Sequence, residues 1–159
     1  DKIKGTLSIM MNGSEKQIQK YIAEFKEEFF GLSAEDVAFP RGVNGIKKYE
    51  ENNKYIKGTP IHVKGSIIYN RLVKENNLNL MYQEIRDGDK IKFLYLNKPN
   101  PCGESVISIS NNLPEEFGLN TYINYDMQFV KSFLDPVKVL LDCMGWKSEK
   151  TSTLERFFV

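Results

Sequence analysis

A cluster of turn-forming residues interrupts this chain and most limits what it can fold into. Four turn signals lie within about twenty residues: Pro40-Arg41-Gly42, Asn44-Gly45, Asn52-Asn53 and Gly58-Thr59-Pro60. Glycine, asparagine and proline at this density end regular helices and strands within a few residues. We therefore expect loops over residues 39–60, with regular elements before and after them.

The segment before this cluster predicts an amphipathic helix. Ser14 and Gln17 form the capping-box pattern Ser-x-x-Gln, in which each side chain satisfies an amide of the first helical turn. Apolar residues then recur at spacings of three and four as far as Phe29, and Gly31 follows as the stop. Residues 33–36 predict a second, brief helical start.

The segments after the cluster alternate in type. Residues 65–76 have helical spacing, and Asp87-Gly88 is a turn before an aromatic-rich strand at 90–96. Residues 105–110 predict a second strand. Residues 125–146 predict a long helix with Asp126 as N-cap, in which Pro136 marks a kink or a boundary.

This order of elements predicts an α+β fold. Helices from both ends of the chain pack together, and a small β/loop region is inserted between them. The length of 159 residues suits one domain, with residues 1–146 as its body and 147–159 as a flexible tail. Because the chain starts at Asp1 rather than Met, we expect a piece of a longer protein.

The charge distribution points to an anionic partner. The chain has 22 basic and 21 acidic residues, a net charge of +1. Residues 41–74, however, hold eight basic and two acidic residues, a local charge of +6. Phosphate-binding surfaces have this character, but a solvated, loop-rich surface that is basic by chance explains the composition equally well. The candidate phosphate ligands within residues 41–74 include Arg41, Lys48, Lys57, Lys64 and Arg71.

Catalytic motifs are missing from the sequence. There is no phosphate-binding loop, nucleophile elbow or zinc-protease motif. The single histidine, His62, is more often structural in such an apolar context, and Cys102 and Cys143 have no cationic neighbour to activate them. We expect no metal site, no membrane segment and no enzymatic activity in this chain alone. A small enzyme built on His62 with Asp87 and Asp89 is a minor alternative.

The last residues predict a peptide that binds a partner. A polar stretch at 147–150 precedes Thr151, and Leu154, Phe157 and Phe158 together form a three-pronged apolar plug within one helical turn. Such a plug suits a pocket on another protein. The alternative is that this segment folds back on the core of its own chain.

Six segments carry a recognisable pattern: residues 39–43, 57–65, 88–93, 98–101, 113–118 and 131–136. Taken in order, they resemble the C-terminal thumb of T-even-type phage family B DNA polymerases. The resemblance runs from about residue 4 to the end, and Leu154 with Phe157 and Phe158 stands where that family keeps its sliding-clamp-binding peptide.

The resemblance implies a thumb that grips primer–template duplex DNA through backbone phosphates. It implies phosphate contacts at Lys48, Lys57, Lys64 and Lys131, with His62 shaping their loop. Three positions differ from relatives: Ser105 and Asp135 replace basic residues, and Thr151 replaces the glutamine of general clamp-binding boxes.

The implied partners are duplex DNA, the sliding clamp and the polymerase palm, in the cytoplasm of an infected bacterial host. Mg²⁺ would bind the palm carboxylates, outside this chain. The rival hypothesis is a stand-alone adaptor that binds a clamp or another protein without touching nucleic acid.

Overall fold

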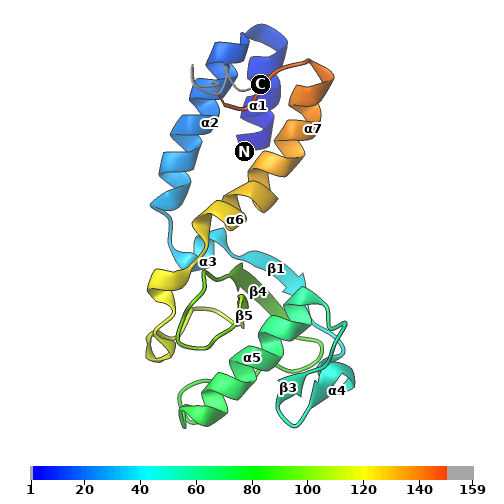
Figure 1. The fold of residues 1–159 in the computed structure, drawn as a ribbon, viewed down its shortest axis with the longest axis vertical. Coiled ribbons are helices and arrows are strands. Elements are labelled where there is room, and N and C mark those ends of the chain that lie inside the picture. Colours follow the sequence, from blue (N-terminus) through cyan, green and yellow to red (C-terminus); the bar gives the residue numbers. More distant parts are fainter. Residues whose placement is uncertain (1, 150–159) are drawn as a thin grey trace. The chain divides into compact units, whose positions relative to one another are not determined.

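The protein divides into two compact units, one made of both chain ends and one made of the middle (Figure 1). In this computed structural model the structure describes residues 2–149. The first unit contains the chain up to Leu32 and from Phe129 onward, and the second contains Ser33–Gln128. Helices from both ends thus pack together in one unit, and the segment inserted between them in the sequence holds the β-sheet, which confirms the predicted α+β fold. The boundary predicted at residue 146 stays a prediction.

The unit made of the chain ends is helical. The predicted capping box is present, because Gln17 N donates to Ser14 Oγ and Ser14 N donates to Gln17 Oε1. Aromatic rings join the N-terminal and C-terminal helices, with the Phe25 and Phe133 centroids 4.7 Å apart and those of Phe29 and Phe129 5.3 Å apart. The elements are α1 (Lys2–Asn12), α2 (Glu15–Phe30), the end of α6 (Tyr125–Phe129), a π-helical turn (Val130–Leu134) and α7 (Asp135–Cys143).

Two details of the predicted C-terminal helix were wrong. Asp126 is not its N-cap, because Asn124 Oδ1 accepts the amide of Met127 instead. The helix also ends at Cys143 and not at residue 146. The irregularity predicted at Pro136 is present as a π-helical turn, in which Asp135 N donates to Val130 O. Pro136 explains this turn, since a proline lacks an amide donor and its ring crowds the preceding helical turn.

The middle unit is built on an antiparallel sheet with strand order β1-β4-β5. The predicted strands at 90–96 and 105–110 are confirmed as β4 (Lys90–Tyr95) and β5 (Val106–Ile109). The expectation of loops over residues 39–60 was partly wrong, since these residues also form regular elements. They are β1 (Phe39–Gly42), α4 (Ile46–Tyr49) and a hairpin of β2 (Glu50–Glu51) and β3 (Lys54–Tyr55).

Strand β1 has no recognisable strand pattern in the sequence, because its extended structure depends on pairing with a neighbouring strand. It pairs antiparallel with β4, placing Phe39 opposite Phe93, and the two rings lie 5.2 Å apart. Short segments with proline are poor strands by themselves, but an edge position tolerates a residue without an amide donor. The remaining elements of this unit are α3 (Ala34–Val37), α5 (Ile61–Glu75) and the 3₁₀ turns Glu115–Phe117 and Asn120–Tyr122.

Helix α5 lies against β5 at a contact that only glycine allows (Figure 1). A Cβ atom on Gly65 would lie 2.8 Å from the backbone nitrogen of Ser108 and 2.5 Å from its Oγ. The backbone of α5 is further tied to the strand by Ser108 Oγ, which donates to His62 O over 3.0 Å. Gly65 therefore sets the distance between the helix and the sheet.

We predict that Gly65→Ala destabilises the protein by about 1–3 kcal/mol, because the added methyl group forces α5 away from β5. This loss exceeds the gain in helix propensity that alanine brings. Urea unfolding of the chain measures the difference. Gly42→Ala is the matched control, since a Cβ atom at Gly42 meets nothing within 4 Å. Equal effects of the two substitutions would contradict the close-approach argument.

Candidate nucleic-acid interface

A polar cluster fixes the β2–β3 hairpin against α5. Lys64 Nζ lies 4.7 Å from the centroid of the Tyr55 ring, within the range of a cation–π contact. The Tyr55 hydroxyl donates to Glu104 Oε2 over 2.8 Å. Burial, followed by the hydrogen bond and the charge of Glu104, raises the pKa of Tyr55, so the phenol stays a donor over a wide pH range. The cluster orients Lys64 at the surface.

Arg71 belongs to the same cluster but is already paired with carboxylates. Its Nη1 lies 3.8 Å from Glu104 Oε1, and its Nε lies 3.8 Å from Glu75 Oε1. The side chains of Arg71 and Glu104 are only 18% and 16% exposed. Arg71 Nε is buried and has no hydrogen-bond partner among residues 2–149. The predicted phosphate ligand at this position therefore has its charge compensated within the chain.

Arg41 and His62 form a second group. Arg41 extends from the edge strand β1, with its guanidinium 6.0 Å from the centroid of Phe93. His62 lies in the first turn of α5 and is partly exposed. Burial lowers the pKa of His62, and the nearby positive charge of Arg41 lowers it further. The imidazole is thus kept neutral at neutral pH.

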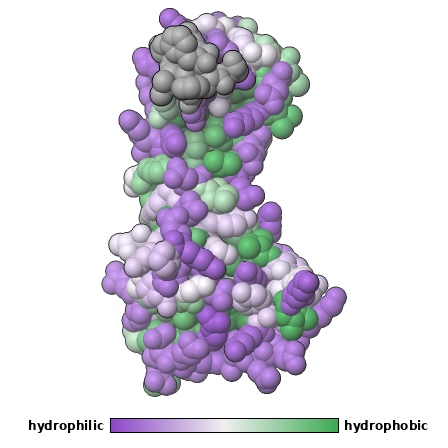
Figure 2. Space-filling view, in the orientation of Figure 1, coloured by the Kyte–Doolittle hydropathy of each residue, from purple (hydrophilic) through white to green (hydrophobic). Residues whose placement is uncertain are grey.

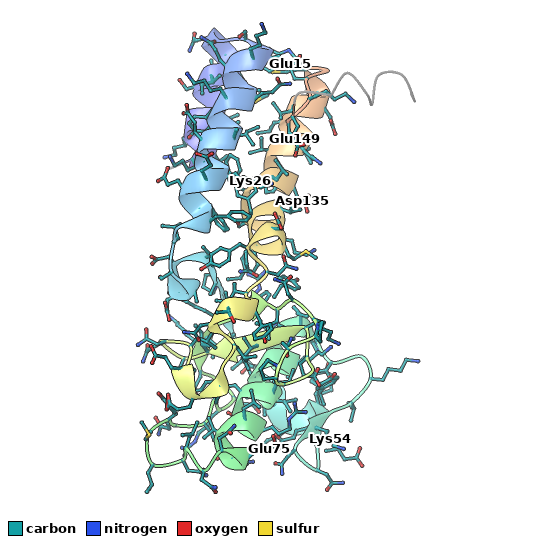
Figure 3. All side chains as sticks on the ribbon, turned by 60° about the vertical axis from the view of Figure 1, so that its left-hand side comes forward. Glu15, Lys26, Lys54, Glu75, Asp135 and Glu149 are labelled. Carbon is teal, nitrogen blue, oxygen red and sulfur yellow. The ribbon has the colours of Figure 1, made fainter. Side chains whose placement is uncertain are left out.

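Lys48 lies on the short helix α4 and Lys57 in the turn before Gly58, and both are exposed. Helix α4 is held by Asp87, whose Oδ1 accepts the amide of Ile46 over 2.7 Å. Lys48 on this helix lies 5.2 Å from its neighbouring Tyr49 ring, and Lys57 precedes Gly58, which adopts φ +88°. Lys47, Lys48, Lys54 and Lys57 are exposed and have no carboxylate within ion-pair distance among residues 2–149. Figure 3 labels Lys54 on the hairpin.

The basic residues predicted from the sequence do not all come together. His62 and Lys64 project from nearly opposite sides of α5, because side chains two positions apart on an α-helix differ in direction by about 200° around its axis. Arg41 lies with His62, whereas Lys64 lies with Arg71 and the hairpin. Lys131 is exposed on the π-helical turn of the other unit. Figure 2 shows a largely hydrophilic surface over the middle unit.

A mixed-charge groove next to α4 adds one cation, Arg86, from outside the basic stretch of residues 41–74. It measures about 690 Å³, and Lys47, Lys74 and Arg86 line it together with Glu50 and Glu84. Lys74 Nζ lies 3.3 Å from Glu84 Oε1, so that part of the groove is neutralised. Arg86 was missed because it lies outside residues 41–74, and only the fold brings it near Lys47.

Other site types find no support in the part of the chain that the structure describes. No group of three or more histidine, cysteine or acidic side chains is placed to hold a metal ion within residues 2–149. No helix in that range is long and apolar enough to span a bilayer. The predicted clamp-binding residues Thr151, Leu154, Phe157 and Phe158 lie outside the described residues.

Comparison with known proteins gives matches to phage replication enzymes. Over 153 residues the chain is 27% identical to the DNA-directed DNA polymerase of Enterobacteria phage T4, which covers 94% of this chain. Over 136 residues it is 25% identical to the DNA-directed DNA polymerase of Escherichia phage RB69, which covers 82% of it. The chain is homologous to part of these phage DNA polymerases. It spans only 17% and 14% of their lengths. No protein-family model matches the chain.

We predict that Arg41→Gln raises the pKa of His62 toward, but not to, its ordinary value, because burial is the larger cause of the shift. His62 is the only histidine, so NMR titration of its ring signals reports this group alone. A lowered folded-state pKa means that His62 contributes stability above about pH 6.5, the unfolded value, and loses it as pH falls through the folded value. Lys54→Gln is the control, and an equal shift in both variants would contradict the effect of the Arg41 charge on His62.

Proposed function

We propose that this chain is the thumb region of a family B phage DNA polymerase and grips primer–template duplex DNA through backbone phosphates. The observation that carries the proposal is the homology to two phage DNA polymerases over 94% and 82% of the chain. Phosphate contacts position a protein on a duplex without reading its sequence, as a polymerase that copies any template requires.

The ion pairs of the predicted phosphate ligands differ, which supports different roles for these residues in binding DNA. Lys48 and Lys57 have no carboxylate partner within residues 2–149, so binding a phosphate costs them no existing ion pair. Lys64 lies over the neutral Tyr55 ring and has no carboxylate within ion-pair distance among residues 2–149. Arg71 would have to share its charge with Glu75 and Glu104. We therefore assign the main duplex contacts to Lys48, Lys57 and Lys64, with Arg41, His62 and Lys131 as further contacts and Arg71 as a support for the hairpin.

The proposal places the chemistry of nucleotide transfer outside this chain. The parent protein would be a nucleotidyltransferase whose palm supplies the carboxylates that bind Mg²⁺. The partners of this chain would be duplex DNA, the palm and the sliding clamp, in the cytoplasm of the infected bacterial host. The terminal residues Thr151, Leu154, Phe157 and Phe158 would tether the enzyme to the clamp. An apolar plug of one leucine and two phenylalanines gives a tether that exchanges, since ordering the segment offsets much of the burial.

We predict that replacing Lys57 and Lys64 together with glutamine reduces the salt dependence of duplex binding. Each lost phosphate contact lowers the slope of log affinity against log salt by about 0.9, so the double variant loses about 1.8. Fluorescence anisotropy with labelled duplexes of different sequence measures both slope and sequence independence. The matched control is Lys16→Gln with Lys20→Gln on α2.

An unchanged slope in the Lys57 and Lys64 double variant would contradict the assignment of these two residues. Absence of duplex binding by the unmodified chain at low salt would contradict the thumb proposal itself. It would favour the stand-alone adaptor, which predicts clamp or protein binding without any nucleic-acid contact.

We predict that Leu154→Ala combined with Phe157→Ala and Phe158→Ala lowers affinity for a T-even phage sliding clamp by at least about tenfold, since several buried anchors are lost. Surface plasmon resonance with immobilised clamp measures the loss. Duplex affinity of the same variant should not change, because the basic residues are untouched. Loss of both activities together would count against a separate tether.

A further inference from the structure

A groove with an apolar floor lies in the unit made of the chain ends. It measures about 540 Å³, and its floor is formed by Ile22, Ala23, Phe129 and Leu134. Polar side chains of α2 form its rim: Lys16, Gln19, Lys20 and Lys26. Figure 3 labels Lys26 and Glu149 on the two chain segments that border it. A volume of this size accommodates a few apolar side chains, as binding pockets of roughly 300–1,000 Å³ do.

The position of the groove points to its occupant. Ser148 and Glu149, the last described residues, themselves line it. The chain continues for ten more residues, and four residues separate Glu149 from Leu154. An extended chain covers about 3.3–3.6 Å per residue, so Leu154 can reach any part of a groove that begins at Glu149. The backbone just before this point is held against α2, because Lys147 N donates to Glu15 Oε2 and Lys147 O accepts from Gln19 Nε2.

The chemistry of the following residues matches the groove. Leu154, Phe157 and Phe158 are apolar like the floor of the groove, and Glu155 and Arg156 stand between them in the sequence, the first with a charge opposite to that of the rim lysines. Attachment to the same chain gives the segment a local concentration in the millimolar range, so even weak contacts suffice to populate the docked state.

We propose that this groove binds the chain's own Leu154–Phe158 segment and that docking competes with an external partner for the same three apolar side chains. The docking itself does not depend on the proposed function. The consequence for clamp binding does rest on it, because the clamp would then meet only chains whose segment has left the groove. The tether would be masked in one state and available in the other.

Paramagnetic relaxation in the full chain tests the docking directly. Cys102→Ser and Cys143→Ser remove the native thiols, and Thr153→Cys takes a nitroxide label next to Leu154. We expect strong broadening of the amide signals of Ile22 and Ala23. The broadening should vanish when Leu154, Phe157 and Phe158 are replaced with alanine.

A groove variant separates this effect from misfolding. Ala23 is exposed on α2, so Ala23→Glu leaves the helix intact while placing a carboxylate on the apolar floor. It should abolish the broadening, whereas Met11→Glu on α1, 83% exposed and outside the groove, should not. If the segment is docked for half to nine-tenths of the time, Ala23→Glu raises clamp affinity by about two- to tenfold.

The results distinguish the two proposals. Absence of broadening at Ile22 and Ala23 in the labelled chain overturns the docking proposal whatever the clamp does. Broadening that appears between mixed labelled and unlabelled copies assigns the groove to a second copy and also overturns it. Broadening with no clamp binding by any variant supports the docking and counts against the tether alone.

Discussion

The close contact between α5 and β5 is the constraint on which the middle unit depends. Gly65 brings the helix backbone to Ser108, and the Ser108 hydroxyl then reaches His62 O. At the other end of the helix the Asn70 side chain forms two hydrogen bonds with the backbone of Ile85, of 2.7 and 2.8 Å. Because both ends are pinned, the side chains of α5 project from a fixed frame.

The fixed position of α5 separates two kinds of basic residue: those that form ion pairs within the chain and those whose charge could bind a partner. Arg71 is inward on α5 and is balanced by Glu104, and breaking such a pair leaves a poorly solvated charge that destabilises the fold. Glu104 also accepts the Tyr55 hydroxyl, so one carboxylate holds the hairpin that carries Lys54. Lys47, Lys48, Lys54 and Lys57, in contrast, have no carboxylate partner in the described residues. A count of positive residues along the sequence cannot make this distinction.

Local sequence patterns predicted those helices, turns and strands whose structure is determined by residues close by in the sequence. The capping box at Ser14 and the turn before β4 were visible because each is complete within a few positions. Strand β1 was not visible, because its order comes from pairing with residues fifty positions away. The same reason hid the partner of Arg71, since Glu104 is 33 residues distant. The π-helical turn before Pro136 was anticipated only as an irregularity, because a proline indicates a disturbance and not its geometry.

The candidate site shows the same limit on a finer scale. His62 and Lys64 are two positions apart in sequence, yet a helix sends them to opposite sides, with Arg41 near one and Tyr55 near the other. A duplex is wide enough to be approached from more than one element, so separate groups of cations are compatible with the proposed grip. The charge balance favours residues 41–74 themselves as the contacting part, since they carry +6 while the rest of the middle unit, Ser33–Gln128, carries −6. The middle unit has no net charge, so a polyanion is attracted by this segment and not by the unit as a whole.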